Sequence, residues 1–203
     1  MSAFLSSGRY SERTFSLIGT LSEKLMARNI VLGTAESCTG GLIAALCTEI
    51  AGSSRWFAGG VVAYSNTLKS VLLGVPPALL DECGAVSGPV VAAMAKGALD
   101  AFPVDLSLAV SGIAGPEGGS EAKPVGTVWI GVGLRLSGGR IGLKEESTAK
   151  VAAVRHHFSG DRGEVRLAAA LAAFEAASDA LDGGAQLRQR DDNHYRQDCL
   201  CNS

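Results

Sequence analysis

The sequence is short of the residues that several common classes of enzyme site require. Only three histidines occur among 203 residues, at His156, His157 and His194. Two of them are adjacent and the third lies in a polar C-terminal stretch, so a serine–histidine–aspartate triad has little material. The sequence also lacks a G-x-x-x-x-G-K-[ST] motif and a G-x-G-x-x-G motif with an acidic residue at dinucleotide spacing, which excludes a P-loop and a Rossmann fingerprint.

Excess charge and long apolar runs are also scarce. The formal net charge is -2, so no basic surplus suggests a nucleic-acid partner. The longest apolar stretches, such as residues 167–174, fall far short of the roughly 20 residues that span a bilayer. Residues 1–13 have no apolar segment of the secretory-signal type. We therefore expect neither a nucleic-acid partner nor a membrane partner.

The cysteines do not form a recognisable framework. There are five, at irregular spacing: Cys38, Cys47, Cys83, Cys199 and Cys201. An odd count in a chain long enough to build its own core is not typical of a disulfide-stapled secreted domain and favours the cytoplasm. The last two form a C-x-C, but no second Cys/His pair lies near enough to suggest zinc. No metal and no cofactor are expected.

What the sequence does contain is material for one compact α/β domain. Hydrophobic residues make up 47% of the chain, which excludes disorder of the whole. Helical periodicity and strand-length apolar runs alternate, and a β-hairpin and a last helix follow. We therefore predict a mixed β-sheet flanked by helices. The predicted domain is 14–183, with a flexible N-terminus at 1–13 and a disordered polar tail at 184–203. The predicted helices are 15–26, 42–50, 66–73, 78–82, 89–102 and 162–181, and the predicted strands are 30–34, 59–64, 106–111, 125–136 and 140–147.

The first segment that suggests chemistry is TAESCTGG at 34–41. It lies where a predicted strand ends and a helix begins, which is the usual ligand position in α/β sheets. Main-chain N–H groups at such a helix start can bind an anion or stabilise an oxyanion. Two glycines permit close approach of a ligand. An ordinary helix cap by Ser37 or Thr39 is an equally good interpretation of the local pattern.

A serine needs a base, and a lysine can replace histidine if burial leaves its amine neutral near pH 7. The segment YSNTLK at 64–69 follows the second predicted strand and offers Tyr64 and Lys69. Taken alone, Lys69 is more typical of a solvated surface lysine, and Tyr64 of a half-buried strand residue.

A glycine-rich loop, SGIAGPEGG at 111–119, follows the third predicted strand. Successive main-chain amides in such a loop can form an anion-binding nest. A plain connecting loop is the alternative, although loops of this length in compact domains are more often functional or disordered.

Taken together, these segments resemble the CinA C-terminal domain family, whose stand-alone members are nicotinamide mononucleotide deamidases. The resemblance is carried, over about residues 15–182, by TAESCTGG (34–41), AGSSRWFAGGVVAYSNTLK (51–69), GAVS (84–87), SGIAGPEGG (111–119), KPVGTV (123–128) and FSGDR (158–162). It implies a compact α/β domain that self-associates as a homodimer or a higher homo-oligomer. It also implies hydrolysis of the carboxamide of nicotinamide mononucleotide to nicotinate mononucleotide and ammonia, in pyridine nucleotide salvage.

The resemblance further implies a catalytic set of Ser37, Tyr64 and Lys69. Substrate contacts are expected in the same motifs, at Glu36, Thr39, Gly40, Gly41, Ser111, Gly112, Ala114, Gly115 and Thr127. In the hypothesis that follows, a neutral lysine accepts the serine proton directly or through the tyrosine, and amides near Thr39 and Gly40 stabilise the oxyanion.

Several alternatives remain open at this point. Glu36 either orients Lys69 or binds ribose, or it is simply an acidic residue favoured near a helix start. Arg162 and Arg166 either meet a phosphate or a neighbouring subunit, or have surface or helix-pair roles. The protein as a whole is either this enzyme or a non-catalytic nucleotide-binding regulatory module of the CinA type. A third reading is an adaptor that uses its Ala-rich last helix as an interface.

Overall fold

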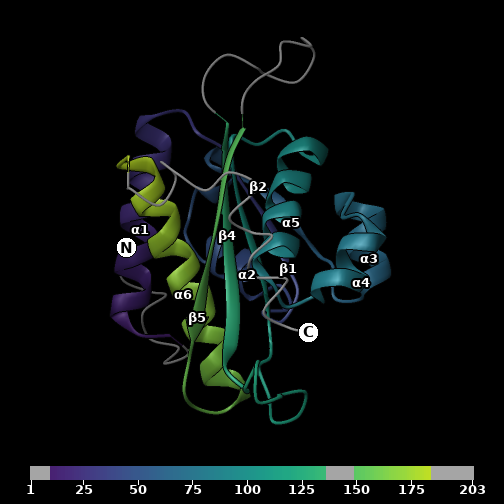
Figure 1. Cartoon of the computed structure of the whole chain (residues 1–203). Coiled ribbons are helices and arrows are strands. Elements are labelled where there is room, and N and C mark those ends of the chain that lie inside the picture. Colours follow the sequence, from purple (N-terminus) through teal and green to yellow (C-terminus); the bar gives the residue numbers. More distant parts are fainter. Residues whose placement is uncertain (1–9, 136–148, 184–203) are drawn as a thin grey trace.

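The computed structural model of the chain describes residues 10–135 and 149–183. It contains a five-stranded sheet in the order β2-β1-β3-β4-β5, with helices on both faces (Figure 1). The strands are β1 (Leu32–Glu36), β2 (Phe57–Val62), β3 (Leu106–Gly112), β4 (Thr127–Arg135) and β5 (Ala149–His157). The helices are α1 (Glu12–Ala27), α2 (Leu42–Thr48), α3 (Asn66–Leu73), α4 (Pro77–Cys83), α5 (Gly88–Ala101) and α6 (Arg162–Leu181), with a short 3-10 turn at Ser53–Arg55.

The sheet is mixed, as the sequence predicts, so the α/β class is confirmed. β1 runs parallel to both β2 and β3, whereas β3–β4 and β4–β5 are antiparallel pairs. The carboxyl ends of β1, β2 and β3 therefore meet at one edge of the sheet. The three segments singled out in the sequence follow these three ends directly, which brings them together at the position where α/β sheets bind ligands.

Two hydrophobic cores lie on opposite faces of the sheet. One joins β-strand side chains to α1, α2 and α6, and the other joins them to α3, α4 and α5. Figure 1 shows α1 and α6 together on one side of the sheet and α3, α4 and α5 on the other. Removal of apolar surface from water contributes about 25 cal/mol per Å² to the free energy of folding, so both layers stabilise the protein.

The helix that carries Lys69 is held by specific local features. Ser65 caps α3 by accepting from the Leu68 N–H, and Gly74 ends it with φ 64°, a conformation that favours glycine. On the neighbouring α5, a Cβ at Gly97 would overlap the carbonyl oxygen of Leu73. The absence of a side chain at Gly97 therefore lets the end of α3 pack closely against α5.

The predicted hairpin is right in kind, but its second strand is displaced. β4 is followed by an antiparallel neighbour, yet that neighbour is Ala149–His157 and not 140–147. The predicted strand at 140–147 and its turn lie outside the described residues. At the N-terminus α1 begins at Glu12, capped by Ser11, two residues before the predicted domain start. The predicted tail at 184–203 also lies outside the described residues.

No helix within residues 10–135 and 149–183 combines the length and the apolar character needed to cross a lipid bilayer.

Candidate active site

The serine of the first motif lies at the end of β1. Its N–H donates to the Val110 carbonyl of β3 at 2.9 Å, and its own carbonyl accepts from the Gly40 N–H at 3.0 Å. Gly40 and Gly41 have φ values of 61° and 90°, which a residue with a Cβ adopts only with strain. The glycines thus allow a tight turn that leaves Ser37 fixed between strand and helix, with its side chain almost fully buried.

Glu36 belongs to the same turn, and its carboxylate binds the main chain at the start of α2. One carboxylate oxygen accepts from the N–H groups of Gly41 and Ile43, and the other accepts from Ala44 and from the Thr34 hydroxyl. These amides begin α2, where main-chain donors lack helical partners and a negative charge is favourable. Of the alternatives for Glu36, the structure shows the helix-start role.

Lys69 reaches Ser37 directly. Its Nζ lies 3.1 Å from Ser37 Oγ and donates to it, and it also donates to the carbonyl oxygens of Ala63 and Tyr64 at 3.0 Å each. The residue is 1% exposed, although local pattern favours a surface lysine. No ion pair among the described residues involves Lys69.

The surroundings of Lys69 make its ammonium form less favourable than that of an exposed lysine. Burial lowers its pKa below the ordinary value of 10.5, and only the nearby Cys38 thiol opposes this shift. A neutral amine has two N–H donors and one lone pair. In that form the carbonyls of Ala63 and Tyr64 can accept both donors, and the lone pair takes the place of the N–H that the protonated lysine donates to Ser37 Oγ. This arrangement can remove a proton from that hydroxyl.

Tyr64 enters the site through its main chain. Its carbonyl accepts from Lys69, whereas its side chain is 58% exposed. The phenol oxygen accepts from Arg162 Nη2 at 3.3 Å, whereas the Ser37–Lys69 contact is direct.

The glycine-rich loop is tied down at both sides of the site. Ser111 donates its hydroxyl to the Ala85 carbonyl at 2.8 Å, which anchors the end of β3 to the segment after α4. Gly112 packs against β4, where a Cβ would overlap Val128 and the Thr127 carbonyl. Gly115 has φ 83° and accepts from Arg162 at 2.8 Å. Ala114, between these two glycines, is buried.

Two predicted contact residues keep buried hydroxyls without a partner. Within residues 10–135 and 149–183, neither Thr39 Oγ1 nor Thr127 Oγ1 makes a hydrogen bond. The predicted oxyanion donors are only partly available, since the Gly40 N–H is already used by the Ser37 carbonyl.

These features correspond to a known family. The sequence model of the CinA C-terminal domain matches residues 15–181, which include every segment described above. The chain belongs to the CinA C-terminal domain family.

The relatives of this chain differ in length. A protein named nicotinamide-nucleotide amidohydrolase PncC from Enterobacter agglomerans is 46% identical over 166 residues, which cover 82% of this chain and 94% of that protein. A CinA-like protein from Mycobacterium avium is 46% identical over 157 residues, which cover 69% of this chain but 36% of that protein. The matched part therefore spans about a third of the longer CinA-like relatives.

Solved CinA structures share the fold. The competence/damage-inducible protein CihA from Agrobacterium tumefaciens is 36% identical, with a TM-score of 0.75 over 85% of this chain and 98% of that chain. A CinA superfamily protein from Klebsiella pneumoniae is 34% identical, with a TM-score of 0.73 over 84% of this chain and 98% of that chain.

In this CinA domain the first turns of α6 connect the serine turn at 34–41 to the glycine-rich loop at 111–119. Arg166 donates from Nε and Nη2 to the Thr39 carbonyl, at 3.2 and 2.6 Å, and Arg162 holds Gly115. The sequence gives no signal that selects Arg166 for this clamp, because its partner lies 127 residues away. Arg162 is the last residue of the FSGDR motif, but only the fold places it beside Tyr64.

Cys38 follows the candidate nucleophile directly, and the CinA domain keeps it inert. Burial raises the pKa of its thiol to about 11, and the Cys38 and Thr39 N–H groups only partly oppose this. Burial also raises the pKa of Cys47. Since the thiolate is the reactive form, alkylation of native Cys38 at neutral pH should be roughly a hundredfold slower than that of an exposed cysteine.

Mass spectrometry after iodoacetamide treatment checks this expectation. Protein unfolded under reducing conditions provides the control, because there Cys38 should be fully modified. Rapid alkylation of Cys38 in the folded protein would contradict the burial of its thiol.

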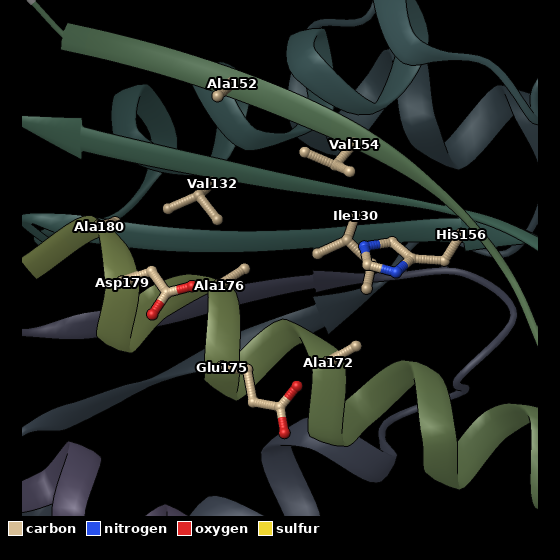
Figure 2. Close-up of a pocket in the computed structure, with 10 residues that line it drawn as sticks. All are labelled: Ile130, Val132, Ala152, Val154, His156, Ala172, Glu175, Ala176, Asp179 and Ala180. Atoms are coloured by element: carbon tan, nitrogen blue, oxygen red, sulfur yellow. The ribbon is translucent and has the colours of Figure 1, made fainter. Parts of the chain in front are cut away.

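The hollow of the CinA domain shown in Figure 2 lies away from Ser37 and Lys69. It measures about 110 Å³ and lies between α6 and strands β4 and β5. Its lining is mainly aliphatic, and His156, Glu175 and Asp179 are its polar members. Burial lowers the pKa of His156, and Glu175 opposes the shift. None of the motif residues of the candidate site lines this hollow.

Proposed function

We propose that this protein is an amidohydrolase that converts nicotinamide mononucleotide to nicotinate mononucleotide and ammonia. The observation that carries the proposal is the contact between Lys69 Nζ and Ser37 Oγ at 3.1 Å, in a buried setting that lowers the lysine pKa. The PncC relative aligns with this chain over 94% of its own length. Its name, nicotinamide-nucleotide amidohydrolase, supports nicotinamide mononucleotide as the substrate.

The proposed reaction uses Ser37 as the nucleophile and neutral Lys69 as the base. Ser37 Oγ bonds to the carboxamide carbon while its proton passes to Nζ. The Thr39 N–H stabilises the developing negative charge of the oxyanion, a contribution of roughly 3 kcal/mol for a good donor. The C–N bond then breaks as the lysine gives this proton to the departing nitrogen, which leaves as ammonia. Water activated by the same lysine hydrolyses the resulting ester.

Tyr64 is the third member of the proposed Ser37–Tyr64–Lys69 set, and its proposed role is not to carry a proton. Its carbonyl fixes the lysine, and its exposed ring beside Arg162 can contact the nucleotide as it enters. We propose contacts with the substrate from the Ser111–Gly115 loop and from the buried hydroxyls of Thr39 and Thr127, which have the donors and acceptors that a bound nucleotide needs. We also propose that the enzyme acts in the cytoplasm, as a homo-oligomer, without a metal or other cofactor.

Purified protein incubated with nicotinamide mononucleotide tests the proposal. We expect release of one ammonia for each nicotinate mononucleotide formed, at the same rate with and without a chelator such as EDTA. Binding of the nucleotide with no ammonia release would contradict the enzyme and favour a regulatory binding module. Loss of activity with EDTA that added metal restores would contradict the metal-free reaction.

A further inference from the structure

The middle of the serine turn is held by one side chain from a distant part of the chain. Arg166 of α6 donates from Nε and Nη2 to the Thr39 carbonyl. Within residues 10–135 and 149–183, no other side chain from outside the turn forms a hydrogen bond with residues 38–40. The conformation of this part of the turn therefore depends on a single long-range contact.

An ion pair does not explain Arg166. None of the ion pairs in the described part of the chain includes it. The acidic residue of α6 that is closest in sequence, Glu164, forms a capping box with Asp161 at the start of the helix. A half-buried guanidinium that binds a neutral carbonyl loses part of its hydration without gaining an opposite charge. The contact with the serine turn is thus the property of Arg166 that calls for a role.

The shape and the support of Arg166 suit it to hold a peptide group. A guanidinium presents its N–H donors in one rigid plane, so two of them on one oxygen restrict the carbonyl more than a single ammonium does. Its neighbours on α6, Val165 and Ala169, are buried in the same hydrophobic core as Ile43 of α2. The arginine therefore projects from the packed layer that also holds the helix after the turn.

The peptide that Arg166 binds is linked to the candidate nucleophile. The Thr39 carbonyl and the Gly40 N–H belong to one planar group, and this N–H donates to the Ser37 carbonyl at 3.0 Å. A contact that fixes one end of the planar group also fixes the end that binds Ser37. Misplacement of a reacting atom by about 1 Å can lower a rate by roughly a hundredfold.

We propose that Arg166 is a positioning residue: it holds the Thr39–Gly40 peptide so that Ser37 Oγ keeps its contact with Lys69. Arg166 acts through the main chain of the turn and not on the substrate. Its effect on turnover rests on the proposed amidohydrolase function, whereas its effect on the conformation of the turn does not.

Alkylation of Cys38 by iodoacetamide tests the hold on the turn without any substrate. Cys38 lies inside the turn and is 5% exposed. Arg166→Met should raise its alkylation rate at least about tenfold, because a loosened turn exposes the thiol. Loss of the arginine charge alone would slow the reaction, since Arg166 lowers the pKa of this thiol and the thiolate is the reactive form. An unchanged or slower alkylation would overturn the proposal.

Two comparisons separate a loosened turn from a damaged fold. Cys47 is buried in the following helix, and it should stay unreactive in Arg166→Met. If Cys47 also reacts, Arg166→Lys is the milder change. It keeps the charge and one donor group, so it should expose Cys38 less than methionine does and leave Cys47 protected. Equal exposure of both cysteines in Arg166→Lys would contradict a local role.

The kinetics of ammonia release test the consequence for turnover. Arg166→Met should lower kcat by roughly 10- to 100-fold and change nucleotide affinity by less than about threefold, with Arg166→Lys in between. Arg13→Met on α1, where the side chain is 89% exposed, is the matched control and should match the wild-type protein in both assays. Faster alkylation of Cys38 with wild-type kcat would overturn the positioning role. A wild-type protein that releases no ammonia would refute the proposed function, and Cys38 alkylation would still decide whether Arg166 holds the turn.

Discussion

Replacing Ser37 by alanine should lower kcat for ammonia release by at least about a thousandfold, because no other group replaces the attacking oxygen. The change removes one buried oxygen and leaves the carbonyls of Ala63 and Tyr64 to hold Lys69. The fold and the substrate-binding loops should therefore persist. Nucleotide affinity, measured by calorimetry, should change by less than about tenfold, since the loss falls on the transition state and not on binding.

Ser16→Ala on α1 is the matched control. Ser16 is exposed and lies on a helix that does not contribute to the site, so this variant should keep wild-type turnover. If Ser37→Ala releases ammonia at a rate within tenfold of the wild-type protein, Ser37 is not the nucleophile. Loss of nucleotide binding together with turnover would instead assign Ser37 to binding.

The α/β fold could be predicted from the sequence because local residue patterns indicate where its helices and strands begin and end. The capped start of α3 at Ser65, its end at Gly74 and the long α6 all agree with their predicted ranges within about a residue. β5 was misplaced because strand-like residues occur on both sides of position 148. Only pairing with β4, from Thr127↔His157 to Arg135↔Ala149, decides which of them form the strand.

The sequence motifs select the residues of the candidate site, but they do not predict the contacts between these residues. Motifs selected Ser37 and Lys69, yet the local pattern around Lys69 is that of a surface lysine. Lys69 is nonetheless buried, because it contacts Ser37 and the carbonyls of Ala63 and Tyr64, and the contact with Ser37, 32 residues away, has no local sequence signal. The same limit applies to Arg166, whose carbonyl partner in the serine turn is far away in sequence.

Replacing Lys69 by alanine or methionine should lower kcat/KM at neutral pH as severely as the loss of Ser37, because the two side chains act as one unit. An ordinary lysine with a pKa of about 10.5 would be neutral in only about one molecule in a thousand at pH 7.5. Burial lowers this pKa, which increases the fraction of neutral base. The wild-type kcat/KM should thus rise with pH and reach its plateau well below pH 10.5.

The two Lys69 variants differ in a way that separates chemistry from structure. Alanine leaves a space next to Ser37 Oγ, whereas methionine fills most of it. Small primary amines in the buffer should therefore restore part of the activity of Lys69→Ala, and they should do little for Lys69→Met. The restored rate should increase with the concentration of neutral amine and not with total amine, because a general base acts through its lone pair. A wild-type profile that is flat toward low pH, or equal rescue of both variants, would contradict a lysine base and leave Lys69 as a structural donor to the carbonyls of Ala63 and Tyr64.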